Sequence, residues 1–287
     1  MNRLARVLQI EENHAVGGGL RLHGAFASGT AEQPLVSVIT AVFNARSTIA
    51  SCITSVLKQD YPAIEHIVID GGSSDGTIEI LRGFESQIAL WRSEPDNGVY
   101  DAWNKGLREA RGQWICFLGS DDELLPSAVS SYMSFAAQHP EAEYISSKVR
   151  WVHPSGYVNP DHGREWSWKR FSKRMCVAHV GSMHRRSLFE RLGKFDTSYK
   201  TAADYELLLR AGENLTTAFM PQLTAIMRAG GMSDQPTAVR EAARAKIISG
   251  GRSALAANLE MCVDGVRFQL LPWRRRFQML RRKYNGR

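Results

Sequence analysis

The sequence predicts an α/β protein in which a mostly parallel sheet is flanked by helices. Over residues 35–140, short apolar runs typical of buried strands alternate with amphipathic helical patterns, and the connections between them are short. Gly-rich or acidic segments follow directly after two of the apolar runs. Open α/β sheets bind their ligands at that edge, so the pattern that predicts the fold also indicates where a site would lie.

Each element of the first half has a local signal. Apolar runs predict the strands, and the helices carry apolar residues at helical spacing, such as Ile49, Ile53 and Val56 on one face. Asp75 stands where it can cap a helix start, and Gly112 ends a helix just before a strand. The predicted order is a strand at 35–42, a helix at 47–59, a strand at 64–69, a helix at 75–82, a helix at 100–110 and a strand at 114–118.

The second half has a less regular pattern. Aromatic, polar, Gly and Pro residues are mixed after residue 143, which predicts strands and long loops over one edge of the sheet. A long helical pattern covers 238–268, and Pro272 is expected to open another helix at Trp273. The other expected elements are strands or loops at 143–152 and 157–171, helices at 185–192 and 203–212, and short strands at 216–220 and 223–228. The predicted division is an irregular lead-in at 1–33, one α/β domain at 34–235 and a helical basic tail at 236–287.

Composition excludes several classes of protein. The 287 residues are 44% apolar and 23% charged, as in soluble globular proteins, and the sequence has no apolar run long enough to span a membrane. Residues 1–10 are too short and too charged for a secretory signal, and the four cysteines have no CxxC spacing, so we expect reduced thiols in a cytoplasmic protein. Seven basic residues and no acid lie in 272–287, which accounts for the whole net charge of +7, so no nucleic-acid partner is expected.

The most informative segment is the apolar run 114–118 followed by Asp121 and Asp122. Two adjacent carboxylates at the end of a buried strand repel each other and are costly to desolvate unless a cation shares them. Carboxylate oxygens are the ligands that Mg²⁺ and Mn²⁺ prefer, usually together with the phosphates of a substrate. The pair therefore predicts a divalent-metal site, and capping of the helix that begins near Pro126 is the structural alternative.

A second polar segment, IDGGSSDGT, follows the strand at 64–69. Its glycines let the backbone approach a flat ligand and leave free N–H groups at the next helix start. The segment contains neither GxGxxG nor GxxxxGK, so it indicates neither a dinucleotide fold nor a P-loop. We expect Asp70 to contact a ligand and Asp75 to cap the following helix.

Five motifs together resemble family 2 glycosyltransferases of the GT-A fold. The motifs are SVITAVFNA, VIDGGSSDGT, SEPDNGVYDAWNKG, the Asp121–Asp122 pair and AADYELLLR, and they fall within residues 34–235. The resemblance is closest to bacterial enzymes that build lipopolysaccharide, capsule and exopolysaccharide. It implies a Rossmann-like catalytic domain and an inverting transfer of a sugar from a nucleotide-diphosphate sugar to a hydroxyl of a glycan or lipid-linked glycan acceptor.

The resemblance also implies roles for residues of the nucleotide pocket. It puts Ala41 and Phe43 near the base and gives Asp70 a hydrogen bond with the base. Asp96 and Asn104 match positions that help to close the nucleotide site.

Further implied roles concern the diphosphate and the acceptor. Asp121 and Asp122 resemble the aspartates that contact the ribose and coordinate Mn²⁺ or Mg²⁺ at the diphosphate, and Asp204 matches the catalytic base of inverting members. His179 agrees with a histidine of close relatives that touches the diphosphate or the acceptor, with a buried structural histidine as the alternative. The region that shapes the acceptor pocket in this fold contains three tryptophans, Trp151, Trp166 and Trp168.

Two departures from the family pattern leave a second function open. Gly119 and Ala203 stand where many members have acids, so metal affinity could be weaker and Asp204 is the only carboxylate at its position. A catalytically silent nucleotide-sugar-binding protein is the alternative that these losses suggest. Arg228 and the loop at 230–233 could fold over the diphosphate, because paired glycines supply mobile lids, or form a plain surface turn.

The tail predicts a peripheral contact with the inner face of the cytoplasmic membrane. Apolar residues repeat there at helical spacing, and arginines surround them, as in helices that bind anionic bilayers. Packing of the same face on the domain or on a second subunit is the alternative. The face consists of Val266, Leu270, Trp273, Phe277, Leu280 and Tyr284.

Overall fold

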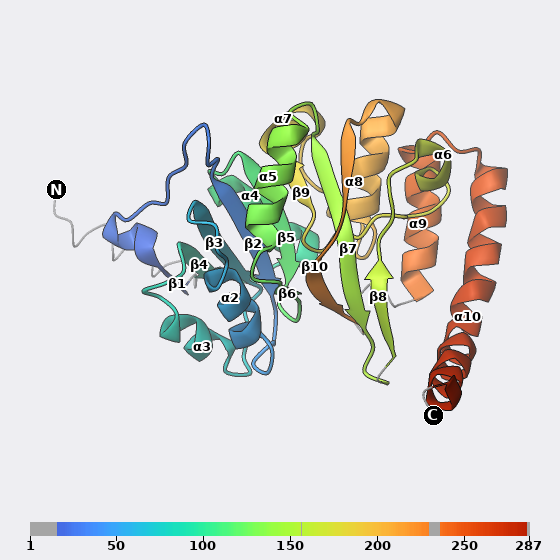
Figure 1. Ribbon diagram of the computed structural model, residues 1–287, viewed down its shortest axis with the longest axis horizontal. Coiled ribbons are helices and arrows are strands. Elements are labelled where there is room, and N and C mark those ends of the chain that lie inside the picture. The colour runs from blue at the N-terminus through green and yellow to red at the C-terminus, as the bar shows by residue number, and fades with distance from the viewer. Residues whose placement is uncertain (1–15, 156, 230–235, 286–287) are drawn as a thin grey trace.

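One sheet runs through the computed structural model and carries helices on both faces (Figure 1). The structure describes residues 16–155, 157–229 and 236–285, with side chains for all of these except 160, 161, 268 and 271–285. The strand order is β1-β4-β3-β2-β5-β9-β7-β10-β6, and β8 pairs with β7. The described strands are β1 Val16–Gly18, β2 Val36–Val42, β3 Ile64–Asp70, β4 Leu90–Ser93, β5 Trp114–Gly119, β6 Glu123–Leu124, β7 Tyr144–Val152, β8 Val158–His162, β9 Met183–Arg185 and β10 Thr217–Arg228.

The helices cover the two faces in separate layers. The described helices are η2 Leu20–His23, α2 Ile49–Leu57, α3 Thr77–Gly83, α4 Val99–Glu109, α5 Ala128–Gln138, α6 Trp168–Phe171, α7 Arg186–Leu192, α8 Ala203–Ala211, η3 Gly212–Asn214, α9 Pro236–Ile248 and α10 Ala254–Asn285. Residues that alternate along β5 divide between two apolar clusters. Cys116 packs with residues of α2, α3 and α5, whereas Phe117 packs with residues of α4, α7 and α8. A strand buried on both faces explains why the run 114–118 is continuously apolar.

The centre of the sheet is parallel, as the sequence predicts. Strands β4, β3, β2 and β5 are parallel neighbours, and every residue of β2 is buried. The register pairs Val42 with Asp70 and Ala41 with Gly119, so the ends of three strands lie side by side. The α/β class with a mostly parallel sheet is therefore confirmed. Outside this centre, β1, β6, β8 and β9 pair in antiparallel fashion with their neighbours, whereas β7 and β10 are parallel to each other.

Several predicted elements are corrected by the structure. The two strands expected at 216–220 and 223–228 form the single strand β10, Thr217–Arg228, because a register shift between Met220 and Leu223 accommodates Pro221 within it. The lead-in is not irregular over residues 16–23, where β1 pairs with β4 and Arg21 forms a 2.5 Å ion pair with the buried Glu65. A buried carboxylate needs such a partner, which explains why this part of the chain is ordered. The three-segment division itself stays a prediction.

The helical tail also differs from its prediction. The helix expected over 238–268 is two helices, α9 and α10, because Gly250 and Gly251 interrupt it, the latter at a φ of +63°. The backbone of α10 continues through Pro272, which therefore opens no new helix. A proline inside a helix costs about 3 kcal/mol, which a long run of good helix formers can offset.

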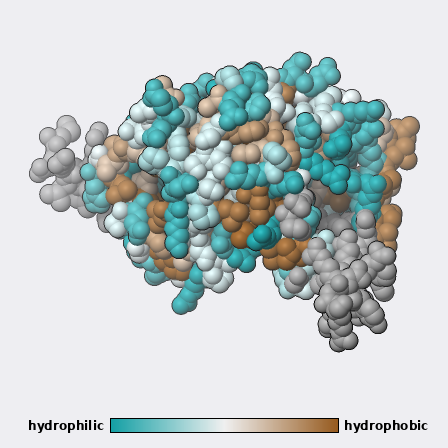
Figure 2. All heavy atoms as spheres, in the orientation of Figure 1, coloured by the Kyte–Doolittle hydropathy of each residue, from teal (hydrophilic) through white to brown (hydrophobic). Residues whose placement is uncertain are grey.

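The described part of α10 presents an apolar face to solvent. Figure 2 shows apolar residues along the outer edge of this helix. They follow helical spacing and are at least half exposed: Leu255, Leu259, Val263, Val266 and Leu270. The other four residues of the predicted membrane face lie outside the described side chains. None of the described helices combines the length and the apolarity needed to cross a bilayer. The four cysteines, all in the described part, are free thiols.

Candidate active site

The turn after β3 is built around the carboxylate of Asp70, which is fully buried. The backbone N–H groups of Gly72 and Ser73 donate to Oδ2 at 3.0 and 2.9 Å, and the Ser93 hydroxyl donates to the same oxygen at 2.5 Å. The Ser73 hydroxyl donates to Oδ1. Four donors on one carboxylate fix the turn from within. The predicted hydrogen bond between Asp70 and a base, in which the carboxylate would accept, stays a prediction, and the structure gives Asp70 a positioning role.

The turn after β2 is joined to the turn after β3. Asn44, at a φ of 48°, accepts a hydrogen bond from Ser74 N–H at 3.0 Å and donates its own N–H to the Ser73 hydroxyl at 2.7 Å. Asp75 accepts from the backbone N–H of Arg46 and of Thr77, so it has a structural role, but the N-cap of α3 is Gly76 and not Asp75 as predicted. Asn44 was missed by sequence reasoning, because nothing in the pattern indicates a left-handed residue there.

The two turns together form a polar platform beneath an exposed ring. Phe43 follows β2 and is 62% exposed, whereas Ala41 is buried in the strand between Ile69 and Gly119. An exposed aromatic ring on a rigid turn is suited to stacking on a flat base. Base contact by Ala41 and Phe43 stays a prediction, and the geometry supports Phe43 more strongly.

Asp96 and Asn104 lie on α4 or just before it and have different surroundings. Asp96 accepts a hydrogen bond from Gly98 N–H at 2.8 Å, and burial raises the pKa of its carboxyl. A Cβ added at Gly71 would lie 2.6 Å from Asp96 Oδ2, so the carboxylate closes directly over the Asp70 turn. Asn104 is buried and bonds through both ends of its amide to the backbone of Phe195. Because that amide is already used, the structure gives Asn104 a role in holding a loop rather than in closing the site.

The turn after β5 carries the two adjacent aspartates. Asp122 is 5% exposed, and its Oδ1 accepts the backbone N–H of Arg228 at 2.9 Å. Burial, and then the neighbouring Asp121, raise the pKa of the Asp122 carboxyl to about 7. Burial also raises the pKa of Asp121. A cation bound between the two carboxylates would offset their electrostatic repulsion and the free energy of desolvating them.

Gly119 explains one departure from the family pattern. A Cβ at this position would lie 2.7 Å from Asp122 Oδ2 and 3.1 Å from Asp121 Oδ1. The glycine is therefore needed for both carboxylates to turn toward the end of the strand. An acid at position 119 would require a different arrangement of the pair.

The described residues supply only part of a metal coordination sphere. Among the described residues, no three His, Cys, Asp or Glu side chains are close enough to hold an ion. Two carboxylates fit a hard cation such as Mg²⁺ or Mn²⁺ that completes its shell with water and substrate phosphates. Arg228 forms an ion pair with Glu123 at 2.7 Å beside the pair, and the predicted lid at 230–233 lies outside the described residues.

Asp204 stands in the first turn of α8 and contacts a residue that the sequence did not single out. The hydroxyl of Tyr100 donates to Asp204 Oδ1 at 2.9 Å. Burial raises the pKa of Asp204, and the hydrogen bond from Tyr100 opposes that shift. A partly exposed carboxylate with a raised pKa and a fixed orientation is suited to accept a proton. Tyr100 lies within the motif SEPDNGVYDAWNKG, which is the signal that could have identified it.

His179 does not lie at an open position. Its ring is 8% exposed and packs 5.3 Å from Trp103 and 5.7 Å from Phe117, nearly parallel to the latter. Neither ring nitrogen has a hydrogen-bond partner among the described residues, and burial lowers the pKa of the imidazole to about 3. A neutral ring enclosed by aromatics matches the structural alternative and does not support contact with a diphosphate or acceptor.

Comparison with known proteins identifies the family. Residues 37–193 match the description Glycosyl transferase family 2. The chain belongs to this family. The transferase is 38% identical over 185 residues to an uncharacterized glycosyltransferase of Mycobacterium tuberculosis, covering 62% of this chain and 69% of the relative. It is 27% identical over 215 residues to a PGL/p-HBAD biosynthesis glycosyltransferase of Mycobacterium bovis, covering 70% and 80% of the two chains.

Solved structures confirm the GT-A fold of the transferase. TarS 1–349 of S. aureus in complex with UDP-GlcNAc matches with a TM-score of 0.62 at 17% identity, covering 82% of this chain and 72% of TarS. The mannosyltransferase PcManGT of Pyrobaculum calidifontis, in complex with GDP-Man and Mn²⁺, matches with a TM-score of 0.58 at 18% identity, covering 88% and 76%.

Proposed function

We propose that the transferase moves a sugar, with inversion, from a nucleotide-diphosphate sugar to a hydroxyl of a glycan or lipid-linked glycan in bacterial surface polysaccharide synthesis. The observation that carries the proposal is the buried Asp122 carboxyl held beside Asp121 at the carboxyl end of β5. Complexes of structural neighbours with UDP-GlcNAc and GDP-Man support a nucleotide-sugar donor. The relative named for PGL/p-HBAD biosynthesis supports a role in building a surface glycan.

Asp121 and Asp122 would hold Mn²⁺ or Mg²⁺ in this reaction. When bound, a divalent cation supplies charge stabilisation to the departing diphosphate. Asp122 must be ionised to bind it, and the pKa of about 7 allows this near neutral pH. The Mn²⁺ complex of PcManGT supports the assignment. Phe43 would stack on the base, and the Asp70 turn would hold that ring in place.

Asp204 would act as the general base. An acceptor hydroxyl has to lose its proton as its oxygen attacks the anomeric carbon, and a single displacement inverts that centre. The hydrogen bond from Tyr100 would keep the carboxylate in one orientation and leave it ionised. The raised pKa of Asp204 would make it a better proton acceptor than an exposed aspartate.

A change at Asp204 tests the assignment of the base. Asp204→Asn is expected to lower kcat by about 10² to 10⁴ with little change in nucleotide affinity, since a base acts in the chemical step. Release of UDP or GDP from a panel of nucleotide sugars with Mn²⁺, with and without EDTA, measures the activity. Tyr100→Phe is the matched control, which keeps the ring and removes only the hydrogen bond. A folded Asp204→Asn variant with normal turnover would contradict the assignment, and nucleotide binding without turnover in the unaltered chain would favour the silent binder.

We also propose that the tail attaches the transferase to the cytoplasmic face of the membrane. The apolar face of α10 is exposed at Val266 and Leu270, which supports a surface left open rather than one packed on the domain. Arginines continue along the sequence of 272–287. Sedimentation with anionic and neutral vesicles, with and without residues 272–287, tests this. Equal binding by both forms would make the tail structural.

A further inference from the structure

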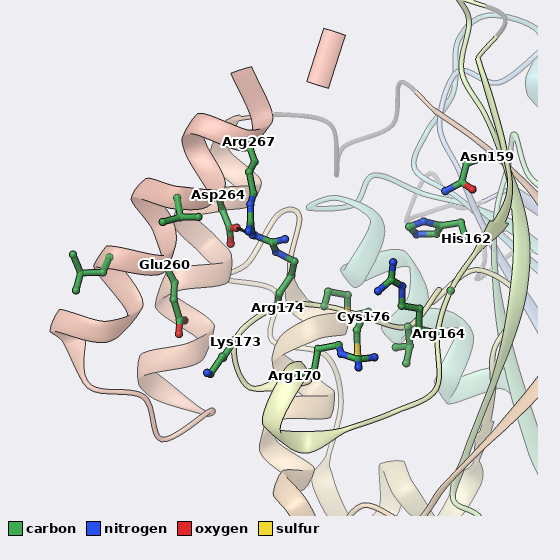
Figure 3. Close-up of a pocket in the computed structure, with 15 residues that line it drawn as sticks. Asn159, His162, Arg164, Arg170, Lys173, Arg174, Cys176, Glu260, Asp264 and Arg267 are labelled. Carbon is green, nitrogen blue, oxygen red and sulfur yellow. Dashed lines mark ion pairs between the residues drawn. The ribbon is translucent and has the colours of Figure 1, made fainter. Parts of the chain in front are cut away.

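A large cavity lies between α10 and the segment 162–177 (Figure 3). Its volume is about 820 Å³, which is enough for a molecule of substantial size. Figure 3 shows side chains entering it from both walls, with Arg164 and Arg170 on one side and Asp264 and Arg267 on α10. Among the residues whose side chains the structure describes, five basic ones line the cavity, against two acidic ones.

Both acidic side chains are already neutralised. Asp264 pairs with Arg174 and lies 3.7 Å from Arg267, and Glu260 pairs with Arg252. Lys246, on α9, adds a further contact to each acid, at 3.3 Å to Glu260 and 3.8 Å to Asp264. These pairs hold α10 in position as one wall of the cavity. Among the described lining residues, no acid is left to compensate the other cations.

Three basic residues of the opposite wall have no such partner. Arg164, Arg170 and Lys173 line the cavity and are exposed, and none of them forms an ion pair within the described part of the chain. Three cations around one concave space attract an anion with several charged oxygens, and guanidinium groups match phosphate in particular. The charge of this wall therefore indicates a phosphate ligand.

Part of the remaining lining is apolar, beside Asn159, His162, Gly163 and Cys176. Met175 and Val177 lie on the wall with the free cations, and Leu259 and Val263 lie on α10. The two α10 residues are at least half exposed and so form an apolar rim. A free phosphate ion would gain nothing from these surfaces, whereas an apolar chain attached to a phosphate would bury them.

The wall with the free cations is connected to Asp204. Arg170 belongs to α6, and its neighbour Phe171 accepts a hydrogen bond from the Tyr205 hydroxyl at 2.6 Å and packs 5.0 Å from that ring. Tyr205 directly follows Asp204 on α8. A molecule anchored in the cavity is thus held by the element that packs on the helix of the proposed base.

We infer that this cavity binds the phosphate of an amphiphilic phosphate ester, and that the acceptor of the transferase carries such a group. This inference rests on the proposed function and names the chemical class of its acceptor. The free cations Arg164, Arg170 and Lys173 hold the phosphate, and the apolar rim on α10 holds the attached chain.

Octyl phosphate below its micelle concentration is the probe, with binding to the full chain measured by calorimetry. Wild type is expected to bind it at least tenfold more tightly than inorganic phosphate, while octanol does not bind. The variant with Arg164→Gln, Arg170→Gln and Lys173→Gln should lose at least tenfold in affinity. The matched control is Arg108→Gln with Lys194→Gln and Arg240→Gln, which removes the same charge from exposed positions outside the cavity and should bind as wild type does.

Other outcomes overturn the inference in distinguishable ways. Equal affinity for inorganic and octyl phosphate would show that the apolar rim does not bind the attached chain. Displacement of octyl phosphate by UDP would assign the cavity to the donor. Sedimentation on phosphatidylglycerol vesicles that depends on the three cations, with no binding of octyl phosphate, would make the source a bilayer headgroup. UDP binding in both the wild type and the cavity variant shows that they are folded and that the donor site is intact. A wild type that binds UDP but not octyl phosphate sinks this inference alone, whereas a wild type that does not bind UDP sinks the proposed function.

Discussion

Two acidic turns lie on either side of β2, at the same edge of the sheet, and they satisfy their carboxylates in opposite ways. Asp70 receives hydrogen bonds from Gly72, Ser73 and Ser93 within its own neighbourhood. Asp122 is almost as buried but receives one bond from Arg228 and has a second carboxylate beside it. An aspartate at a strand end can therefore have one of two roles. With many protein donors around it, its carboxylate fixes the shape of the site, and with few donors, its carboxylate remains available to bind a ligand such as a cation.

The largest effect should follow from removing a carboxylate of the incomplete turn. Asp122→Asn keeps an oxygen to accept the Arg228 N–H but cannot share a cation, so kcat/KM with Mn²⁺ should fall by about 10³, equivalent to several kcal/mol. The folded structure should remain, because no buried donor loses its acceptor. Steady-state kinetics and circular dichroism measure the two properties. Activity near that of wild type, or wild-type activity that persists in excess EDTA, would break the comparison.

The complete turn should respond in stability instead. Asp70→Ala leaves the hydroxyls of Ser73 and Ser93 and two N–H groups without their acceptor, so the free energy of unfolding should fall by about 3 kcal/mol or more. Urea denaturation measures this change. Ser93→Ala removes a single donor and should cost only about 1 kcal/mol. A variant at Asp70 as stable as wild type, with nucleotide binding lost, would instead make Asp70 a direct ligand of the base.

The pH dependence of stability separates the two turns further. The pKa of Asp122 in the folded chain is about 7, above that of an unfolded aspartate, so ionisation destabilises the metal-free fold as pH rises from about 4 through 7. In EDTA at pH 8, Asp122→Asn should therefore be more stable than wild type, by about 4 kcal/mol, with the difference vanishing at pH 4. Thermal melting across this range checks it. A difference that does not vary with pH would mean that Asp122 ionises normally.

A smaller effect is expected when the space between the two carboxylates is filled. Gly119→Ala places a methyl group 2.7 Å from Asp122 Oδ2 and should displace the carboxylate. Activity should fall about tenfold, which is the scale expected when a metal ligand is misoriented but not removed. Gly83→Ala is the control, since nothing lies within 4 Å of its added Cβ. Titration of activity against Mn²⁺ concentration compares the two. An unchanged Mn²⁺ requirement in Gly119→Ala would show that the present arrangement is not needed.

The central strands could be predicted because both of their faces are buried. The run that forms β5 is continuously apolar and those of β2 and β3 are mostly apolar, and the segments after them carry the site residues. β4 was missed because it has only four residues and an exposed Arg92. β9 was missed because its three residues pair with β5 and β7, far away in sequence, and local pattern carries no such information.

The site was predicted less completely than the fold. The motifs indicated Asp121, Asp122 and Asp204, but not that Tyr100 bonds to Asp204 across 104 positions of sequence. Asn104 and His179 were given contacts with substrate, whereas the structure buries both. Spacing in sequence identifies which residues reach an edge of the sheet, and only packing shows which polar groups are already paired.

Mn²⁺ binding in the presence of UDP, followed by electron paramagnetic resonance at pH 8, tests the central claim most directly. The account predicts one Mn²⁺ per chain in wild type, and an affinity at least tenfold weaker in Asp122→Asn than in the surface control Asp196→Asn. The same affinity for Mn²⁺ in Asp122→Asn as in wild type would contradict it, because the Asp122 carboxylate would then not bind the cation.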